Sequence, residues 1–269
     1  MEDETMRTRS SAAHMPVLFL GHGSPMNAVL DNAFTRGLSA LGHALPDFRA
    51  VLAVSAHWYV PGTYLTGEAR PKTIHDFGGF PRELYEIEYP ARGEPELAAR
   101  VSAMLAARGA ELRSDWGLDH GTWSVLRHLR PAADRPVVQL SIDHRLRPEE
   151  HLAIGRSLAP LREQGVLIVG SGNVTHNLRH AMPALTRGDQ GVPQWAAAFD
   201  DQVVRAIDHH DYAFLVSALH TDEGRASHPT PDHYLPLLYA AGAAHADDSV
   251  SYPVEGFDAS LSMRSVRWG

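Results

Sequence analysis

Short apolar runs, each about as long as one buried strand, recur along this chain and alternate with stretches of helical spacing. The runs are rich in Val, Leu and Ile and are bounded by Gly, Pro or His, as buried strands of an α/β sheet are. They are Val17 to Leu20, Ala50 to Ser55, Val137 to Ile142 and Val166 to Val169. None approaches the ~18 consecutive apolar residues of a membrane span.

The segments between these runs repeat apolar residues on one helical face and carry Pro near their starts or Gly at their ends. Helices are predicted for Glu94 to Arg108, Pro148 to Glu163, Gln194 to His210, and Pro231 to Ala241 with Thr230 as its N-cap. Ser260 to Trp268 alternates loosely and is predicted as a closing strand. Such alternation predicts an α/β fold, a single layered domain with a mostly parallel or mixed central sheet flanked by helices.

No repeat or linker divides the chain, so we expect one domain over residues 15–269. Residues 1–14 are polar and lack the apolar core of a signal peptide, and we expect a frayed tail there. The charge balance is 24 basic against 32 acidic residues, a net charge of −8 without any basic run. This argues against a nucleic-acid partner, and we expect a cytoplasmic protein without a membrane partner, with oligomerisation left open.

Histidine is abundant, with 17 residues, whereas cysteine is absent. Disulfides, thiolate nucleophiles and Cys-ligated zinc or iron–sulfur centres are therefore excluded. A metal site in this chain has to be built from imidazole, carboxylate, carbonyl or water.

Three of the predicted strands run directly into a histidine: His22 after Leu18 to Gly21, His57 after Val54 to Ala56, and His176 after Val169 to Thr175. Ligands of open α/β sheets bind outside the carboxyl ends of the strands. His233 follows the stiff segment His228 to Asp232. A single histidine in such a place is more often a hydrogen-bonded loop residue, but four at one edge together predict a shared metal site, which suits Zn, Fe, Cu or Ni.

The remaining motifs are weaker. Ser24, in Gly-His-Gly-Ser-Pro, is not in a nucleophile elbow and is expected to cap the following helix. His75 lies in the loop 73–81, which suits either a lid or a packed turn. The other histidines lie in helical or polar loop contexts, where a solvated role is expected.

Seven ordered segments resemble the LigB-type class III extradiol ring-cleavage dioxygenases, closest to their 4,5-DOPA extradiol dioxygenase group. They are FLGHGSPM (19–26), VSAHW (54–58), TIHDFGGFP (73–81), GLDHGTW (117–123), QLSID (139–143), GSGNVTHNL (170–178) and HPTPDHYLPL (228–237). The resemblance implies an enzyme that opens a catechol ring, DOPA-like, by extradiol cleavage with O2.

Carried over by position, the resemblance implies His22, His57 and His233 as metal ligands. His176 is implied as the acid/base group and as a fourth ligand in a zinc-filled site. His120 is implied as a catalytic polar group that faces the substrate. We place the remaining candidates, His228, Ser24 and His75, in the substrate-binding wall.

The resemblance implies Fe(II) for turnover, but three imidazoles without a carboxylate also suit Zn(II) as the bound metal. Asp119 and Asp232 are candidate carboxylates for orienting a ligand ring. Two alternatives remain open. The all-imidazole set is compatible with a zinc hydrolase, and a fold of this kind can also serve a non-catalytic binding protein.

Overall fold

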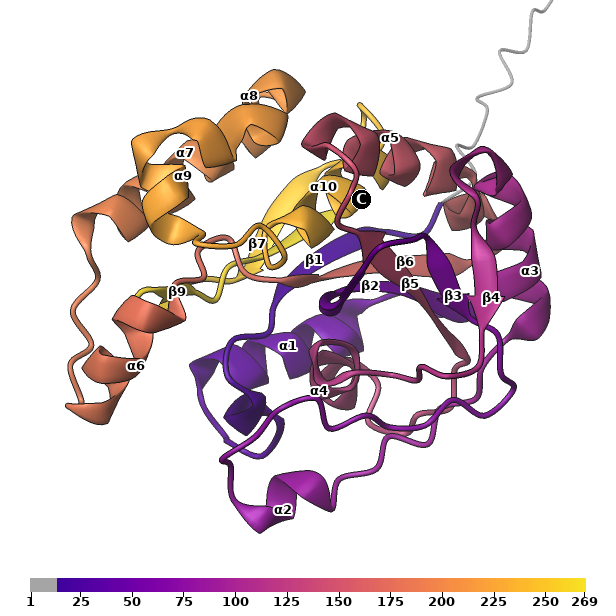
Figure 1. Ribbon diagram of the computed structural model, residues 1–269, viewed down its shortest axis with the longest axis horizontal. Helices are drawn as coiled ribbons and strands as arrows, with labels where there is room; N and C mark the ends of the chain where they lie inside the picture. Colours follow the sequence, from indigo (N-terminus) through magenta and orange to yellow (C-terminus); the bar gives the residue numbers. More distant parts are fainter. Residues whose placement is uncertain (1–13) are drawn as a thin grey trace, which may run out of the picture.

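The computed structural model describes residues 14–269, so residues 1–13 of the expected tail lie outside the described part. Eight strands form one mixed sheet in the order β4-β3-β5-β2-β6-β1-β10-β7, and a separate small sheet pairs β8 with β9 (Figure 1). The strands are β1 Val17–Gly21, β2 Ala50–Val60, β3 Tyr64–Thr66, β4 Glu111–Arg113, β5 Val137–Asp143, β6 Val166–Gly172, β7 Val250–Val254, β8 Phe257–Asp258, β9 Leu261–Ser262 and β10 Ser265–Trp268. The expected α/β class and layered architecture are confirmed.

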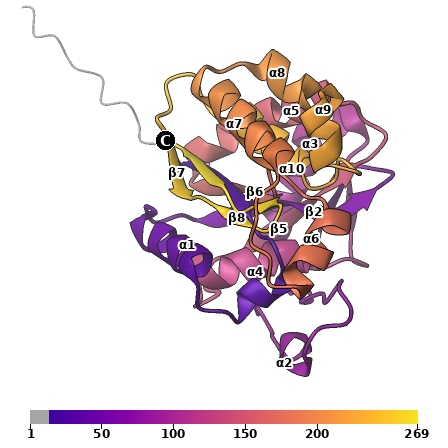
Figure 2. The ribbon, with the colours of Figure 1, turned by 90° about the vertical axis from the view of Figure 1, so that its left-hand side faces the viewer.

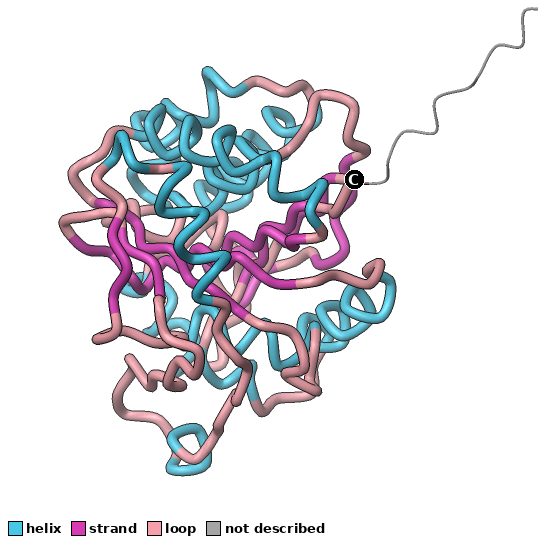
Figure 3. The backbone as a smooth tube through the Cα atoms, turned by 90° about the vertical axis from the view of Figure 1, so that its right-hand side faces the viewer, coloured by secondary structure: helices cyan, strands magenta, loops and turns pink. Residues whose placement is uncertain are grey.

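Helices cover both faces of this sheet (Figures 2 and 3). The α-helices are α1 Ala33–Ala44, α2 Arg82–Tyr85, α3 Pro95–Met104, α4 His120–Leu129, α5 Pro148–Leu158, α6 Leu178–Thr186, α7 Gln194–Asp208, α8 Tyr212–Ser217, α9 Asp222–Ser227 and α10 Leu235–Ala243. Short 3₁₀ helices are η1 Pro25–Ala28, η2 Ala106–Arg108, η3 Ala159–Gln164 and η4 Ala218–His220. Within residues 14–269, no helix is both long and apolar enough to cross a bilayer.

The alternation of side chains along β1 divides the core into two layers. Val17 and Phe19 pack with α3, α5 and α10 on one face, whereas Leu18 and Leu20 pack with α1 and α4 on the other. Both faces are therefore buried, and this is why the strand reads as a continuous apolar run. Helix α10 is buried on all sides, as a helix that is apolar all round has to be.

The last helix begins later than the sequence pattern predicts. It starts at Leu235 instead of Pro231, with Pro236 in its first turn, so Thr230 is not its N-cap. The backbone N–H groups of Tyr234 and Leu235 instead donate to the carbonyl of Pro231, 3.0 and 3.1 Å away, and close a turn before the helix. His233 consequently lies in this turn and not in the helix.

The chain ends also differ from expectation. The predicted closing strand divides into β9 and β10, and β10 runs antiparallel to β1. His14, which the sequence places in the tail, is partly buried, and its Nε2 lies 2.6 Å from Asp248 Oδ1.

Three parallel neighbours in the sheet position the site. Strand β6 lies between β1 and β2, with Gly21 opposite Gly172 and Ser55 opposite Ser171. Because parallel strands end at the same edge, the loops that follow β1 and β6 emerge beside the end of β2. The backbone N–H of His22 still donates to the carbonyl of Gly172, 3.0 Å away, and holds the first of these loops against the sheet.

Candidate active site at the carboxyl ends of the strands

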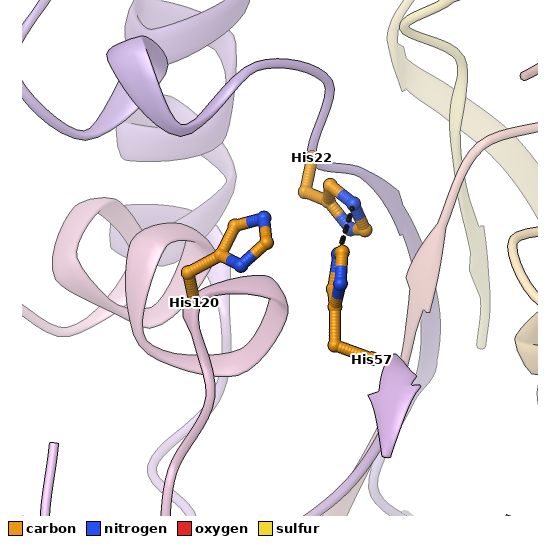
Figure 4. A group of neighbouring side chains, drawn as sticks. All are labelled: His22, His57 and His120. Atoms are coloured by element: carbon orange, nitrogen blue, oxygen red, sulfur yellow. Dashed lines mark hydrogen bonds between the residues drawn. The ribbon is translucent and has the colours of Figure 1, made fainter. Parts of the chain in front are cut away.

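Five histidines from five separate segments line one cavity. They are His22 after β1, His57 within β2, His120 at the start of α4, His176 after β6 and His233 before α10. Figure 4 shows the first three, with the His22 and His57 rings nearly touching and the His120 ring beside them. The sequence-predicted residues His22, His57, His120, His176 and His233 are thus brought together.

Local backbone features place the rings of His57 and His233. The register between β2 and β5 shifts between Val54 and Tyr59, so His57 lies in the irregular stretch, and such bulges redirect side chains. Gly172 lies against the chain at His233, where a Cβ would overlap the carbonyl oxygen of that residue.

The Nδ1 atom of His22 is held by a serine on β6. Ser171 Oγ donates to the carbonyl of Gly121, 2.6 Å away, so its hydroxyl proton is used there. The same oxygen lies 3.0 Å from His22 Nδ1 and therefore accepts from it. The proton of the neutral His22 ring is then on Nδ1, and Nε2 is left with a free lone pair.

Asp76 serves two of the rings in the same way. Its carboxylate accepts from the backbone N–H and Nδ1 of His120, 2.8 and 2.9 Å away. Its Oδ2 also lies 3.3 Å from His57 Nδ1. A carboxylate can only accept, so Nε2 is the free nitrogen of His120, and the nearby carboxylate favours the same tautomer of His57. The sequence pattern does not identify Asp76 as such a partner, although this residue adjoins His75 in the segment 73–81.

The two carboxylates proposed from sequence have different positions. Asp232 hydrogen-bonds to Nδ1 of His233, in the orienting position expected for it. Asp119 instead caps α4 by accepting from the backbone N–H of Thr122, 3.1 Å away, and hydrogen-bonds to Gln139. The orienting role that the sequence predicts for Asp119 therefore belongs to Asp76, whose carboxylate reaches His120 from the loop 73–81.

The free nitrogens fit a shared metal ion. His22 Nε2 and His57 Nε2 are 3.2 Å apart, and with both protons on Nδ1 neither can donate to the other. Two imidazole nitrogens that bind one metal at about 2.0–2.1 Å lie about 3.0–3.4 Å apart. Ligand atoms of His22, His57 and His120 all lie within 4.8 Å of one another. The His233 ring centroid lies 5.1 Å from that of His22 and 5.0 Å from that of His57.

Burial keeps the rings of His22, His57 and His233 neutral. It lowers the pKa of His57 to about 3, with help from His120. Burial, followed by the neighbouring histidines, holds the pKa values of His22 and His233 well below the usual range. Neutral imidazole is the form that binds metals, so the protonation state of these three histidines suits a cation.

His176 packs face to face against one of the other four histidines. Its ring stacks on His233, with the centroids 3.4 Å apart and the planes 4° from parallel. Burial, followed by His228, lowers the pKa of His176 to about 4, so at neutral pH the ring can accept a proton. This arrangement is compatible with an acid/base role.

The cavity has a volume of about 310 Å³, at the lower end of the about 300–1,000 Å³ of small-molecule sites. Besides the histidines it is lined by Gly23, Ser24, Pro25, Asp76, Phe77, Phe80, Leu178, Met182, Leu185 and Leu261. Ser24 thus belongs to the wall, and its hydroxyl also caps η1 by accepting from the Met26 N–H, 3.2 Å away.

Two of the predicted substrate-binding residues are not in this lining. His75 lies behind the wall, where its Nε2–H donates to the carbonyl of Ile87, 3.0 Å away, and its ring packs against Phe77. His228 is buried, with Nε2 2.7 Å from the carbonyl of Val174 and its ring near Phe199. Both support the cavity from outside.

A family model, two related proteins and one solved structure are similar to this chain over most of its length. The family described as the catalytic LigB subunit of aromatic ring-opening dioxygenase matches residues 10–262. A protein of Escherichia coli K12 named 4,5-DOPA dioxygenase extradiol is 46% identical over 96% of both chains. One of the same name from Beta vulgaris is 38% identical over 84% of this chain and 85% of its own. The crystal structure of an uncharacterized Escherichia coli K12 protein has a TM-score of 0.82 and 42% identity, and covers 95% of this chain and 100% of that chain.

Proposed function

This chain belongs to the LigB family of aromatic ring-opening dioxygenases, and from this premise we propose that it opens a catechol ring by metal-dependent extradiol cleavage, with His22, His57 and His233 as the metal ligands. It is an enzyme of the ring-cleaving oxygenase class, in which both atoms of O2 enter the product. The observation that carries the proposal is the 3.2 Å approach of His22 Nε2 and His57 Nε2, with the His233 ring centroid 5.1 and 5.0 Å from those of His22 and His57 and its Nδ1 occupied by Asp232.

We propose Fe(II) as the metal for turnover and Zn(II) as the other cation that this set would hold. A non-haem Fe(II) in this position would bring an electron-rich catechol and O2 together, which lowers the cost of orienting them. The carboxylates Asp76 and Asp232 stand behind the rings rather than among the ligands, where they fix the orientation of each imidazole.

In the proposed reaction, His176 acts as the base that takes a proton from a catechol hydroxyl and later returns it. Its ring is neutral at pH 7 and is stacked on a ligand histidine, so it lies beside any substrate that reaches the metal. His120 faces the same space and orients the substrate, with its Nδ1 proton held by Asp76. Phe77 and Phe80 pack beside the aromatic ring and limit the access of water.

The names of the curated relatives make DOPA the first catechol to be tested. The experiment loads the purified protein with Fe(II) anaerobically and measures O2 uptake and the absorbance of a ring-opened product over a panel of catechols. We expect one O2 to be consumed per catechol. If Fe(II)-loaded protein takes up no O2 with any catechol, the proposal is wrong.

Two matched variants separate ligand from base. His233→Gln is expected to lose bound metal, measured by elemental analysis after dialysis. His176→Gln is expected to keep the metal but to lower kcat by about 10²- to 10⁴-fold, the usual contribution of a positioned acid/base group. His43→Gln, on an exposed face of α1, should change neither quantity. Loss of metal in His176→Gln would instead make this residue a ligand.

The zinc-hydrolase alternative predicts turnover with Zn(II) and no need for O2. The reported relatives carry dioxygenase names, which does not favour it. The same panel under argon tests it directly, because a hydrolase would remain active there.

A further inference from the structure

The active-site cavity has two chemically different halves. Its inner end carries imidazole and carboxylate groups, whereas its outer wall is apolar and comes from three segments: Phe77 and Phe80 in the loop 73–81, Leu178, Met182 and Leu185 on α6, and Leu261 on β9. A catechol bound through its two oxygens at the inner end directs its ring substituent toward this outer wall. The wall therefore determines which substituents are bound well.

Helix α6 presents an apolar stripe to the cavity. Leu178, Met182 and Leu185 follow the i, i+4, i+7 spacing of one helical face. The neighbouring buried side of the helix, Ala181 and Ala184, packs on β9 and fixes the helix in place. Leu178 is 47% and Met182 is 52% exposed. Such exposure of long apolar side chains beside a cavity is typical of a ligand-binding wall.

Among residues 14–269, which the structure describes, no lysine or arginine lines the cavity. Its charged carboxylate is Asp76, and Asp232 stands behind His233. Arg179 follows Leu178 along α6, but one residue is about 100° around a helix, so this side chain leaves from a different face. A substituent carboxylate held against the apolar outer wall would thus lose water without gaining a lysine or arginine partner, which is unfavourable.

We propose that the preferred substrates are catechols whose ring substituent is uncharged and apolar, with its carbon chain packed on Met182, Leu178 and Phe80. This inference rests on the proposed catechol-opening activity and goes beyond it by naming the substituent. An amino-acid substituent, as in DOPA, is bound less well because its carboxylate has no partner in the cavity.

Substrates of equal shape test the charge directly. 4-Propylcatechol, 4-(2-aminoethyl)catechol and 3-(3,4-dihydroxyphenyl)propionate have side chains of similar size that are neutral, cationic and anionic, and DOPA is zwitterionic. We expect kcat/KM for the propionate to be about ten- to a hundredfold below that for 4-propylcatechol. The amine should also lie below 4-propylcatechol, because its charge loses water on the same wall.

A binding measurement gives a readout that does not depend on turnover. Under argon, the dissociation constants of 4-methyl-, 4-ethyl- and 4-propylcatechol are measured by calorimetry. We expect each added methylene to tighten binding about two- to fourfold, as burial on an apolar wall does. The absence of any dependence on chain length would place the substituent in water and overturn the proposal.

A charge introduced on the wall should redirect selectivity. Met182→Arg places a guanidinium where the substituent ends and is expected to raise the propionate-to-propyl ratio of kcat/KM about three- to fivefold. Leu112→Arg is the matched control, since Leu112 is 44% exposed on the distant edge strand β4 and should leave the ratio unchanged.

The outcomes separate this inference from the function on which it rests. If no catechol is turned over, the proposed function fails. If catechols are turned over but DOPA or the propionate equals 4-propylcatechol, the function stands and the inference is wrong. If Met182→Arg alters the oligomeric state in gel filtration and leaves selectivity unchanged, the apolar face belongs to an interface between chains, and the inference is again wrong.

Discussion

Asp76 is the charged residue that two active-site histidines share. It hydrogen-bonds to His120 twice and lies 3.3 Å from His57, so one carboxylate sets the ring orientation of both. Burial alone would raise the pKa of Asp76, but hydrogen bonds from His120 outweigh this effect and hold it below the usual value. The group is therefore an anion behind the proposed metal position, where it strengthens the electron donation of the ligands.

We predict that Asp76→Asn weakens metal binding about 10- to 100-fold, the usual loss when the partner of a ligand histidine is removed. A chelator competition with Zn(II) or Fe(II) measures this without any need for turnover. Asp115→Asn is the matched control, because Asp115 is exposed and paired with Arg113 on the surface. Equal metal affinity in Asp76→Asn and the native protein would contradict an orienting role.

Among single residues, sequence analysis identifies those that have a local signature. The sequence pattern predicts that His22, His57 and His176 follow strands and that His233 follows a stiff segment, and the chain brings all four to one cavity, although His57 lies within β2, which extends to Val60. The pairing of Asp76 with His120 spans 44 positions, and nothing in the sequence near either residue indicates it. Asp119 adjoins His120 in the sequence, but its side chain caps the N-terminus of α4 and does not orient a ligand ring. Adjacency in the sequence therefore does not predict which carboxylate pairs with His120.

At the scale of elements, the start of α4 and the end of β2 meet at Gly121. A Cβ on this residue would overlap Ser55 Oγ and lie 2.8 Å from Cδ2 of His57. The glycine is therefore required for close approach of helix and strand rather than for an unusual backbone angle. This contact sets how far His120, on the helix, stands from His57, on the strand.

We predict that Gly121→Ala displaces His57 and lowers both metal content and kcat, with a loss of about 1–3 kcal/mol in the free energy of unfolding from overpacking. Elemental analysis and urea unfolding measure the two effects. Gly78→Ala is the control, since a Cβ there meets nothing within 4 Å. A fully loaded and active Gly121→Ala protein would show that the helix can move away without cost to the site.

The elements themselves are predicted well where apolar spacing is strong and less well where proline decides the boundary. Pattern alone predicts the buried strands β1, β2, β5 and β6, because both faces of each are covered. It places the last helix four residues early, because Pro231 suits a first helical turn as well as the preceding turn it actually forms. The error moves His233 from a helix to a turn but leaves it at the same sheet edge.

At the scale of the whole molecule, strand order decides whether strand-end histidines can meet. They do meet because β1, β6 and β2 are immediate neighbours and run parallel. Sequence patterns predict the strands but not this order, which depends on packing between distant segments. The antiparallel insertion of β10 between β1 and β7 likewise has no local signal, since the alternation of Ser265–Trp268 is compatible with any neighbour.

The buried ion pair between Arg162 and Asp248 connects segments that lie near the two ends of the described chain. Arg162, in η3, donates to the carbonyls of Met15 and Ala243 and binds both oxygens of Asp248, at 2.7 and 2.9 Å. Both side chains are fully buried. The entry to β1, the end of α10 and the approach to β7 are therefore held by one guanidinium, and an unpaired charge there would be costly.

We predict that Asp248→Asn lowers the free energy of unfolding at pH 7 by about 3–5 kcal/mol, the usual cost of breaking a buried pair. Asp47→Asn, which breaks the exposed pair with Arg135, should cost less than about 1 kcal/mol. Urea unfolding with circular dichroism measures both. Neither residue lines the active-site cavity, so metal content should be unchanged.

The same pair gives the stability a defined pH dependence. Burial alone would raise the pKa of Asp248, but the hydrogen bonds from Arg162 and His14 lower it below the usual value. A carboxyl whose folded pKa is depressed stabilises the fold above its unfolded pKa, near 3.9, and this contribution is lost as the pH falls through the folded pKa. The gap between the native protein and Asp248→Asn should hence be constant from pH 7 to about pH 5 and narrow below about pH 4. A gap that stays constant down to pH 3 would mean that Asp248 is not the titrating group, and that the cost of the substitution comes from packing alone.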